Sequence, residues 1–412
     1  MPYADARIPA AGLILPVYRP NSRPRTETYS GLMRVAVIGA GIIGAAVADA
    51  LARRGASVTV LDMRGAGRGA SQASAGVLAP YTEAQGKHEL LSLCVRSFDR
   101  FDEFVADVAD RSGRSVVLER CGTLEVALTP EEAAYLQRAH AWLSQSGVAS
   151  EWIDARDIRA IDRSVTSASA GALRVGAHGF VPVTALVHAL VQSARLSGAA
   201  FEAPVAAVDV APAQNDVQIR AAGRSYTADH VVVAAGSWSG RIRIAGAKAP
   251  PVRPIRGQLL HLDWSDAASR PSTIVWGHAC YVVPWSDGSV LVGATVEDAG
   301  FDESSTVAGV QTLMSAVTRL LPGAAGASLR DVRVGLRPAA PDELPIVGPL
   351  ASAPNVTLAT AHYRNGILLA PLTAHVVAEY VIDGTIDPSM TLTSPNRFAS
   401  APTEHPHETL AE

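Results

Sequence analysis

The glycine-rich segment at residues 37–44, V-I-G-A-G-I-I-G, constrains the fold of this chain more than any other feature of the sequence. An apolar run at 34–38 leads into it, and a run with helical periodicity at 42–54 follows. A second apolar run comes shortly afterwards, at 57–61. This order predicts a strand, a helix and a parallel strand, and such a βαβ unit is typical of a parallel sheet that is covered on both faces.

The three glycines of the segment, Gly39, Gly41 and Gly44, form the pattern GxGxxG where the strand turns into the helix. The first permits the tight turn, the second lets the backbone approach a pyrophosphate, and the third lets the helix pack closely on the sheet. Asp62 follows the second strand, where a carboxylate can accept hydrogen bonds from a ribose diol. The pattern predicts a dinucleotide site, but the fold alone does not distinguish FAD from NAD.

Charge and composition exclude several other classes of protein. The 412 residues include 35 basic and 39 acidic side chains, and this net charge of −4 argues against a nucleic-acid-binding protein. Cys94, Cys121 and Cys280 form no CxxC pair, so we expect a reduced, cytoplasmic protein. The apolar run at 35–52 is better explained by the βαβ unit than by a membrane span. No cluster of metal ligands is found, so no metal site is expected.

The rest of the chain mixes helical and strand patterns. Helices are predicted at 87–110, 130–146 and 183–197 and after Gly366, and strands at 123–127, 230–234, 258–262, 281–284, 290–293 and 356–359. We therefore expect a Rossmann-like α/β domain that is interrupted by a largely antiparallel second domain. Residues 1–32 are expected to form a flexible extension, and the tail from about Thr391 shows no regular pattern either.

A loop of small and hydroxyl-bearing residues at 69–80, G-A-S-Q-A-S-A-G-V-L-A-P, suits close approach to a flat ring, although an ordinary small-residue loop has the same composition. Further motifs are V-V-V-A-A-G-S-W-S at 231–239, G-L-R-P at 335–338 and H-Y-R-N-G-I-L-L-A-P at 362–371. In these motifs and their order the chain resembles the D-amino-acid oxidase family of FAD-dependent flavoproteins, most closely its glycine oxidase branch.

The resemblance implies a domain organisation and a set of site residues. The FAD-binding domain would comprise 33–115, 175–250 and 333–399, the substrate-binding domain 116–174 and 251–332, and a flexible tail 400–412. FAD, held without a covalent bond, would contact Gly39, Gly41, Ile42, Ile43, Gly44, Asp62, Met63, Ala70, Ser71, Ala75, Gly76, Val77, Val205, His362, Tyr363, Arg364, Asn365, Gly366, Ile367 and Leu368. At the substrate, Arg337 would hold the carboxylate, Tyr281 would support it, and Arg364 would line the pocket beside the flavin.

These residue types suit amino-acid oxidation, because a planar guanidinium can grip both oxygens of a carboxylate and so orient the Cα–H bond. The residues alone leave open an ion pair of Arg337 with Asp342, a solvent-exposed position for Arg364 and a plain core position for Tyr281.

The resemblance implies that the enzyme oxidises glycine, sarcosine or small D-amino acids with dioxygen, giving an imine or oxo acid, ammonia and hydrogen peroxide. It also implies that the glycine imine supplies thiamine thiazole synthesis. The alternatives are a D-amino-acid or sarcosine oxidase or dehydrogenase of the same fold, and a non-catalytic dinucleotide-binding redox sensor. Whether the chain forms a homo-oligomer is left open.

Overall fold

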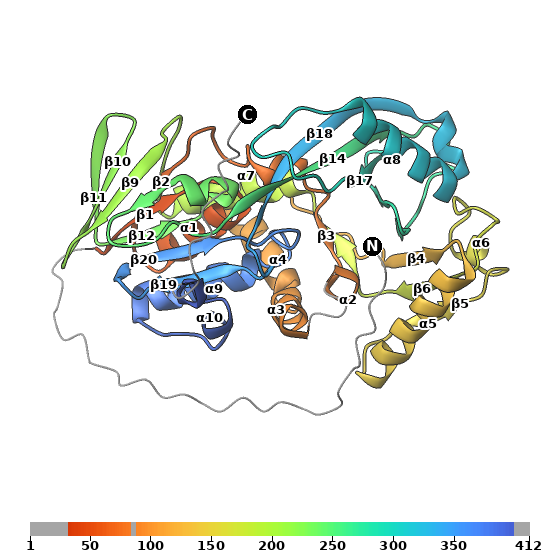
Figure 1. Cartoon of the computed structure of the whole chain (residues 1–412), viewed down its shortest axis with the longest axis horizontal. Helices are drawn as coiled ribbons and strands as arrows, with labels where there is room; N and C mark the ends of the chain where they lie inside the picture. The colour runs from red at the N-terminus through yellow and green to blue at the C-terminus, as the bar shows by residue number, and fades with distance from the viewer. Residues whose placement is uncertain (1–31, 84–87, 399–412) are drawn as a thin grey trace, which may run out of the picture.

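A computed structural model of the chain describes residues 32–83 and 88–398 (Figure 1). The expected tail at 400–412 and nearly all of the expected extension at 1–32 lie outside the described residues. Within them, two large sheets meet in the middle of the molecule, and the βαβ unit belongs to the first.

The first sheet has six strands and contains both strands of the predicted βαβ unit. In spatial order they are β19 (Ile346–Leu350), β20 (Ala353–Thr360), β12 (His230–Val233), β1 (Arg34–Ile38), β2 (Ser57–Leu61) and β8 (Ala200–Glu202). All neighbouring pairs are parallel except β19 with β20. The predicted parallel sheet is therefore confirmed.

The two faces of this sheet are covered by different layers. Val35 and Val37 of β1 pack against helices α1 (Ile42–Arg53), α7 (Val183–Leu196) and α9 (Ala370–Asp383). Ala36 and Ile38, on the opposite face, pack against a four-stranded sheet of β11 (Arg224–Ala228), β10 (Val217–Ala221), β9 (Ala207–Pro212) and β13 (Arg243–Ile244). Because both faces are buried, the strand is a continuous apolar run.

The second sheet has eight strands and lies on the right of Figure 1. Its order is β18 (Ser328–Ala339), β14 (Arg253–Asp263), β17 (Ser289–Gly293), β16 (Tyr281–Pro284), β15 (Ile274–Trp276), β4 (Thr123–Ala127), β6 (Gly171–Val175) and β5 (Glu151–Ile153). Only the pair of β15 and β4 is parallel, so the predicted antiparallel part is confirmed.

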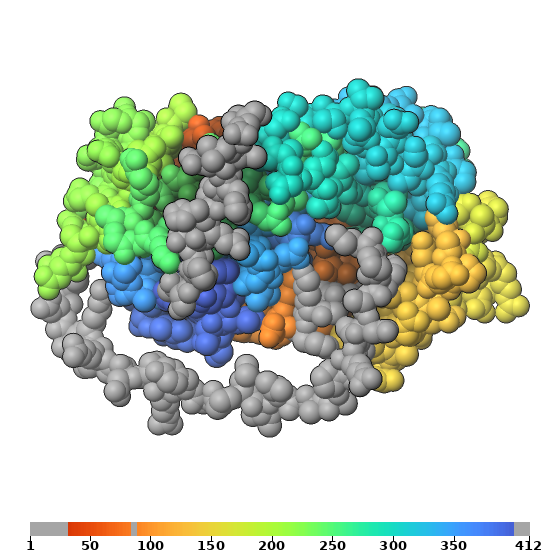
Figure 2. All heavy atoms as spheres, in the orientation of Figure 1, coloured from red at the N-terminus to blue at the C-terminus, as the bar shows by residue number. Residues whose placement is uncertain are grey.

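Helices α5 (Pro130–Gln145) and α8 (Val307–Leu320) cover this second sheet. Figure 2 shows the resulting surface, with the α8 part in cyan at the upper right and the α5 part in yellow below it. A short sheet of β3 (Val77–Leu78) and β7 (Gly179–Phe180), the helix α6 (Ile158–Ile161) and the 3₁₀ turns η1 (Ala70–Ala73), η2 (Gly236–Arg241) and η3 (Pro322–Gly326) complete the middle of the chain.

The helix predicted at 87–110 consists of two helices, α3 (His88–Phe98) and α4 (Phe101–Ser112). A short helix, α2 (Pro80–Glu83), precedes them. No helix of the described residues is long and apolar enough to cross a membrane.

The prediction of an irregular tail from about Thr391 is wrong for the residues up to Phe398. There the chain forms α10 (Ser389–Leu392) and the turn η4 (Pro395–Phe398). Polar contacts hold this segment, because Thr393 donates a hydrogen bond of 2.8 Å to the carbonyl oxygen of Val347 and Arg397 pairs with Asp342. Such contacts leave no apolar period in the sequence.

Candidate functional site

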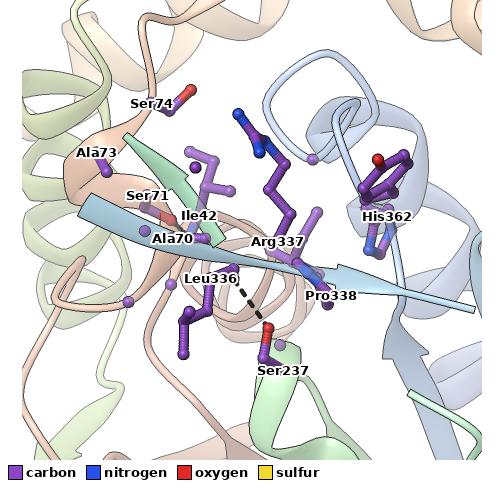
Figure 3. A pocket seen from close by; sticks show the side chains of 18 of the residues that line it. Ile42, Ala70, Ser71, Ala73, Ser74, Ser237, Leu336, Arg337, Pro338 and His362 are labelled. Carbon is purple, nitrogen blue, oxygen red and sulfur yellow. Dashed lines mark hydrogen bonds between the residues drawn. The ribbon is translucent and has the colours of Figure 1, made fainter. Parts of the chain in front are cut away.

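A cavity of about 520 Å³ lies between the two large sheets, and its size is that of a pocket for a small molecule or cofactor. One end is lined by the turn from β1 to α1 and by Asp62. The other is lined by the end of β18, the start of β16 and the segment after β20. Figure 3 shows Arg337 projecting from β18 into this space, on the opposite side of the strand from Ser237.

At two positions of the glycine motif, other backbone atoms approach so closely that only a residue without a side chain fits. Gly39 has a φ of +108°, and a Cβ atom there would lie 2.4 Å from the carbonyl oxygen of Ala234. A Cβ atom on Gly44 would lie 1.9 Å from the carbonyl oxygen of Gly39. The N-terminal end of α1 lines the cavity, and the dipole of the helix favours a phosphate there.

The side chain of Asp62 organises the same end of the cavity. One carboxylate oxygen accepts a hydrogen bond of 2.7 Å from the backbone N–H of Ala40. The other accepts hydrogen bonds from the backbone N–H groups of Arg64 and Gly65, each 2.7 Å long. A carboxylate has about four acceptor positions, so one remains for a ribose hydroxyl. The helix end and this carboxylate fit the diphosphate and ribose of FAD.

Arg337 brings a positive charge to the other end of the cavity. Its Nη1 donates to the carbonyl oxygens of Thr295 at 2.9 Å and Arg256 at 3.4 Å, and it forms no ion pair with any described residue. Asp342, the suggested partner, instead pairs with Arg397 at 2.8 Å, so that alternative is wrong. Burial lowers the pKa of Arg337. A desolvated cation of this kind is stabilised by an anionic ligand.

Tyr281 and Arg364 line the cavity together with Arg337. Burial raises the pKa of Tyr281 to about 12, so its hydroxyl stays protonated and able to donate. Arg364 has the solvent-exposed position that the sequence left open, with 41% of its side chain accessible, but its guanidinium also lies 3.2 Å from the carboxylate of Glu83. Glu83 was not among the predicted site residues.

The segment after β20 is held in an unusual backbone conformation beside β18. Ala361 and Tyr363 have φ values of +58° and +48°, which non-glycine residues adopt at a cost. The backbone N–H of Tyr363 donates a hydrogen bond of 2.8 Å to the carbonyl oxygen of Pro338. Nε2 of the His362 ring lies 3.0 Å from the hydroxyl oxygen of Thr373, within hydrogen-bond distance. Burial lowers the pKa of His362 to about 3, so the ring is neutral.

The structure brings most of the predicted site residues to one cavity. Those that line it are Gly39, Gly41, Ile42, Ile43, Asp62, Met63, Ala70, Ser71, Ala75, Val205, Tyr281, Arg337, His362, Tyr363, Arg364, Gly366 and Ile367. Gly44, Gly76, Val77, Asn365 and Leu368 are not among the lining residues. The individual contacts with FAD stay predictions.

Other lining residues were missed from the sequence. Trp238 lies under the guanidinium of Arg64, 4.3 Å from it, and its ring also packs beside the ring of Phe301. The guanidinium of Arg241 lies 3.5 Å above the ring of Phe301. Residues 236–240 read G-S-W-S-G, and this run of small residues carries no pattern that marks its tryptophan as a binding residue. The hydroxyl of Ser237 donates a hydrogen bond of 2.8 Å to the carbonyl oxygen of Leu336 and so links η2 to β18 (Figure 3).

Comparison with known proteins gives the class of this fold and site. The family described as "FAD dependent oxidoreductase" matches residues 34–380, and the chain belongs to it. This membership confirms the predicted resemblance, FAD as the cofactor and an oxidoreductase activity.

The relatives include proteins named ThiO/ThiG and proteins named glycine oxidase. The chain is 32% identical to the "Bifunctional protein ThiO/ThiG" of Nostoc sp. over 86% of its own length, but it spans only about half of that relative, 53%. It is 29% identical to the "Glycine oxidase" of Geobacillus kaustophilus, covering 84% of this chain and 92% of the relative. The crystal structure of glycine oxidase from the same organism superposes with a TM-score of 0.84, at 29% identity, over 89% of this chain and 99% of that one.

Proposed function

We propose that this protein oxidises glycine or a similarly small α-amino acid to its imine, which hydrolyses to the oxo acid and ammonia, with dioxygen as the final electron acceptor and hydrogen peroxide as its product. The proposal depends most on one observation: the positively charged side chain of Arg337 lines the cavity and forms no ion pair with any described residue, so it can bind the carboxylate of a substrate. The similarity to proteins named glycine oxidase supports it. FAD, when bound, supplies the hydride acceptor.

The protein's own part in this chemistry is to bind and orient the substrate. Nη1 of Arg337 is anchored on the Thr295 carbonyl oxygen at 2.9 Å, so the guanidinium has a defined position. Its remaining N–H groups can grip both oxygens of a carboxylate, as a lysine could not. The hydroxyl of Tyr281 lines the same space and can donate a further hydrogen bond to that carboxylate. Together they would fix the Cα–H bond in one orientation.

A place in thiamine biosynthesis is also part of the proposal. It is supported by the resemblance to the glycine oxidase branch and by the similarity to ThiO/ThiG proteins. If the chain serves that route, the imine itself is the useful product, because it feeds the thiazole ring. The measurement is whether the chain restores growth without thiazole to a bacterium that lacks its own glycine-oxidising enzyme for this step.

The experiment that tests the oxidase proposal follows the visible spectrum of the purified protein under anaerobic conditions. We expect a yellow protein that releases FAD on acid precipitation and is bleached by glycine. Sarcosine and small D-amino acids are compared in the same assay, which separates the alternative oxidases. A protein that keeps its flavin spectrum with all of these substrates would contradict the proposal.

Arg337→Ala should keep FAD but lose about 10²–10³-fold or more in kcat/KM, because a charge-assisted bidentate contact is worth about 3–5 kcal/mol. Arg337→Lys should recover only part of this loss. An amine without a carboxylate should be a poor substrate of the wild type and should be affected much less by either change. Near wild-type oxidation of glycine by Arg337→Ala would show that the carboxylate binds elsewhere.

A further inference from the structure

Glu83, at the end of α2, places a carboxylate in the cavity beside the groups assigned to the substrate. It lines the cavity together with Arg337, Tyr281 and Arg364. Its side chain is only 11% exposed, and Oε2 lies 3.2 Å from Nη2 of Arg364. This buried oxygen nevertheless receives no hydrogen bond from any described residue. The oxygen therefore has a positive charge beside it but no hydrogen bond, and because it borders the cavity it can accept one from a donor that a ligand brings.

An α-amino acid carries such donors in its ammonium group, at one bond from the carbon that bears its carboxylate. If Arg337 takes the carboxylate, the ammonium lies in the same cavity as Glu83. We propose that Glu83 binds the amino group of the substrate and accepts one of its protons. This inference rests on the proposed function, because it assigns the second half of the same substrate.

The proton transfer is a simple exchange of bonds. One N–H bond of the ammonium breaks and its electron pair stays on nitrogen, while an O–H bond forms on a carboxylate oxygen of Glu83. The neutral amine then has the lone pair that forms the C=N bond as the Cα–H bond is broken. Glu83 returns its proton to solvent after the product has left. The substrate can therefore bind as the zwitterion, which is its abundant form near neutral pH.

Charged and titratable groups from several elements face Glu83. Burial raises its pKa, and the guanidinium groups of Arg364 and Arg337 act in the opposite direction more weakly. The negative charge of Glu83 in turn raises the pKa values of Tyr281 and Cys94, whose larger cause is burial. A carboxylate whose pKa is raised is a stronger base than one in water.

Glu125 of β4 is a second buried carboxyl group near Glu83 and supplies a matched control. It accepts a hydrogen bond of 2.6 Å from the hydroxyl of Thr82 and does not line the cavity. Burial raises its pKa to about 7. Glu125→Gln and Glu83→Gln therefore remove one carboxylate each from the same neighbourhood, but only the second removes one that faces the substrate.

The test measures the rate of flavin reduction by glycine in an anaerobic stopped-flow instrument, with FAD-loaded protein, as a function of pH. In the wild type we expect the efficiency of reduction to be nearly level from about pH 7 to about pH 9, because Glu83 takes the ammonium proton. Glu83→Gln should lose on the order of 100-fold at about pH 7 and approach the wild type at about pH 10, where glycine arrives with a neutral amine. Glu125→Gln should show no such change of the deficit with pH.

Two further measurements separate this role from a structural one. Acetate has the carboxylate but no amine or other hydrogen-bond donor, so its dissociation constant, read from the flavin spectrum, should change little in Glu83→Gln. Glu83→Asp keeps a carboxylate and should keep the wild-type shape of the pH profile.

A deficit of Glu83→Gln that is equal at both pH values, or weaker acetate binding of the same size, would overturn the inference. If Glu83→Gln loads no FAD, the pH profile of the wild type tests the inference alone. An efficiency of flavin reduction that rises tenfold per pH unit up to the amine pKa of glycine would exclude a protein base. A wild type that no small amino acid reduces would instead refute the proposed function, and the inference with it.

Discussion

Gly257 in β14 is the residue on which the guanidinium of Arg337 lies. A Cβ atom added to Gly257 would come 2.3 Å from Nη2 and 2.4 Å from Cζ of Arg337. Gly257 pairs with Gly335 in a regular register, and its φ is not in the left-handed region, so alanine needs no new backbone conformation there. The atoms in conflict are the end of a flexible side chain. We therefore expect Gly257→Ala to displace Arg337 and leave the strand in place.

The size of the effect follows from these distances. Non-bonded heavy atoms approach to about 3.5 Å, so the guanidinium must move by about 1 Å. A misplacement of that size costs about 100-fold in kcat/KM, or about 3 kcal/mol, if Arg337 orients the substrate. The hydrogen bond from Arg337 to Thr295 would weaken as well, and its loss costs about 1 kcal/mol of stability. Gly257→Ala should thus lower activity far more than stability.

The assay is kcat/KM for glycine, measured by peroxide formation, together with FAD per chain and the melting temperature. Gly176→Ala is the control, because a Cβ atom at Gly176 meets nothing within 4 Å. It should resemble the wild type in all three measurements. Wild-type kcat/KM in Gly257→Ala would refute the reasoning. So would a loss of FAD as large as the loss of activity, because the strand would then have moved.

Three other changes test other parts of the structure. Gly44→Ala places a Cβ atom 1.9 Å from the carbonyl oxygen of Gly39, which cannot swing aside, so little FAD-loaded protein should be recovered on purification. Phe301→Ala removes the ring 3.5 Å below the guanidinium of Arg241, and the loss of this cation–π contact should lower the free energy of unfolding, read from the urea midpoint, by about 1 kcal/mol. The folded protein holds the proton of Glu125 up to about pH 7, whereas the unfolded chain loses it near pH 4.3, so stability should fall as pH rises through this window. Glu125→Gln should lack that fall in its urea midpoint.

The part of the fold around the glycine motif could be predicted because its determinants are local. The strands at Arg34–Ile38 and Ser57–Leu61 have the predicted ends, and the helix between them differs by one residue. Each of these elements is specified by its own apolar pattern and by glycines within a few residues. The layer on the far face of the sheet could not be predicted in this way, because a sheet of β9, β10, β11 and β13 buries the same kinds of apolar side chain, such as Ala36 and Ile38, that a helix would bury.

The site residues that lie in sequence motifs could be predicted, whereas Glu83, which lies in none of them, could not. Arg337, Tyr281 and Arg364 were assigned by resemblance, and all three line one cavity. Glu83 follows the loop at 69–80 by three residues, but an acidic residue on a short helix carries no pattern of its own. Its role depends on Arg364, which is 281 positions away in the chain and 3.2 Å away in space.

The charges at this end of the cavity explain why the site would select an α-amino acid over a simple amine or a simple carboxylic acid. Arg337 and Arg364 bring two positive charges and Glu83 one negative charge to this end of the cavity. A carboxylic acid would satisfy Arg337 but leave Oε2 of Glu83 without a donor, and an amine would satisfy Glu83 but leave Arg337 without an anion. Because each unsatisfied buried group costs about 1–3 kcal/mol, and more when it is charged, a ligand that lacks either group loses affinity. Both groups are needed on one small molecule, whichever side chain it carries.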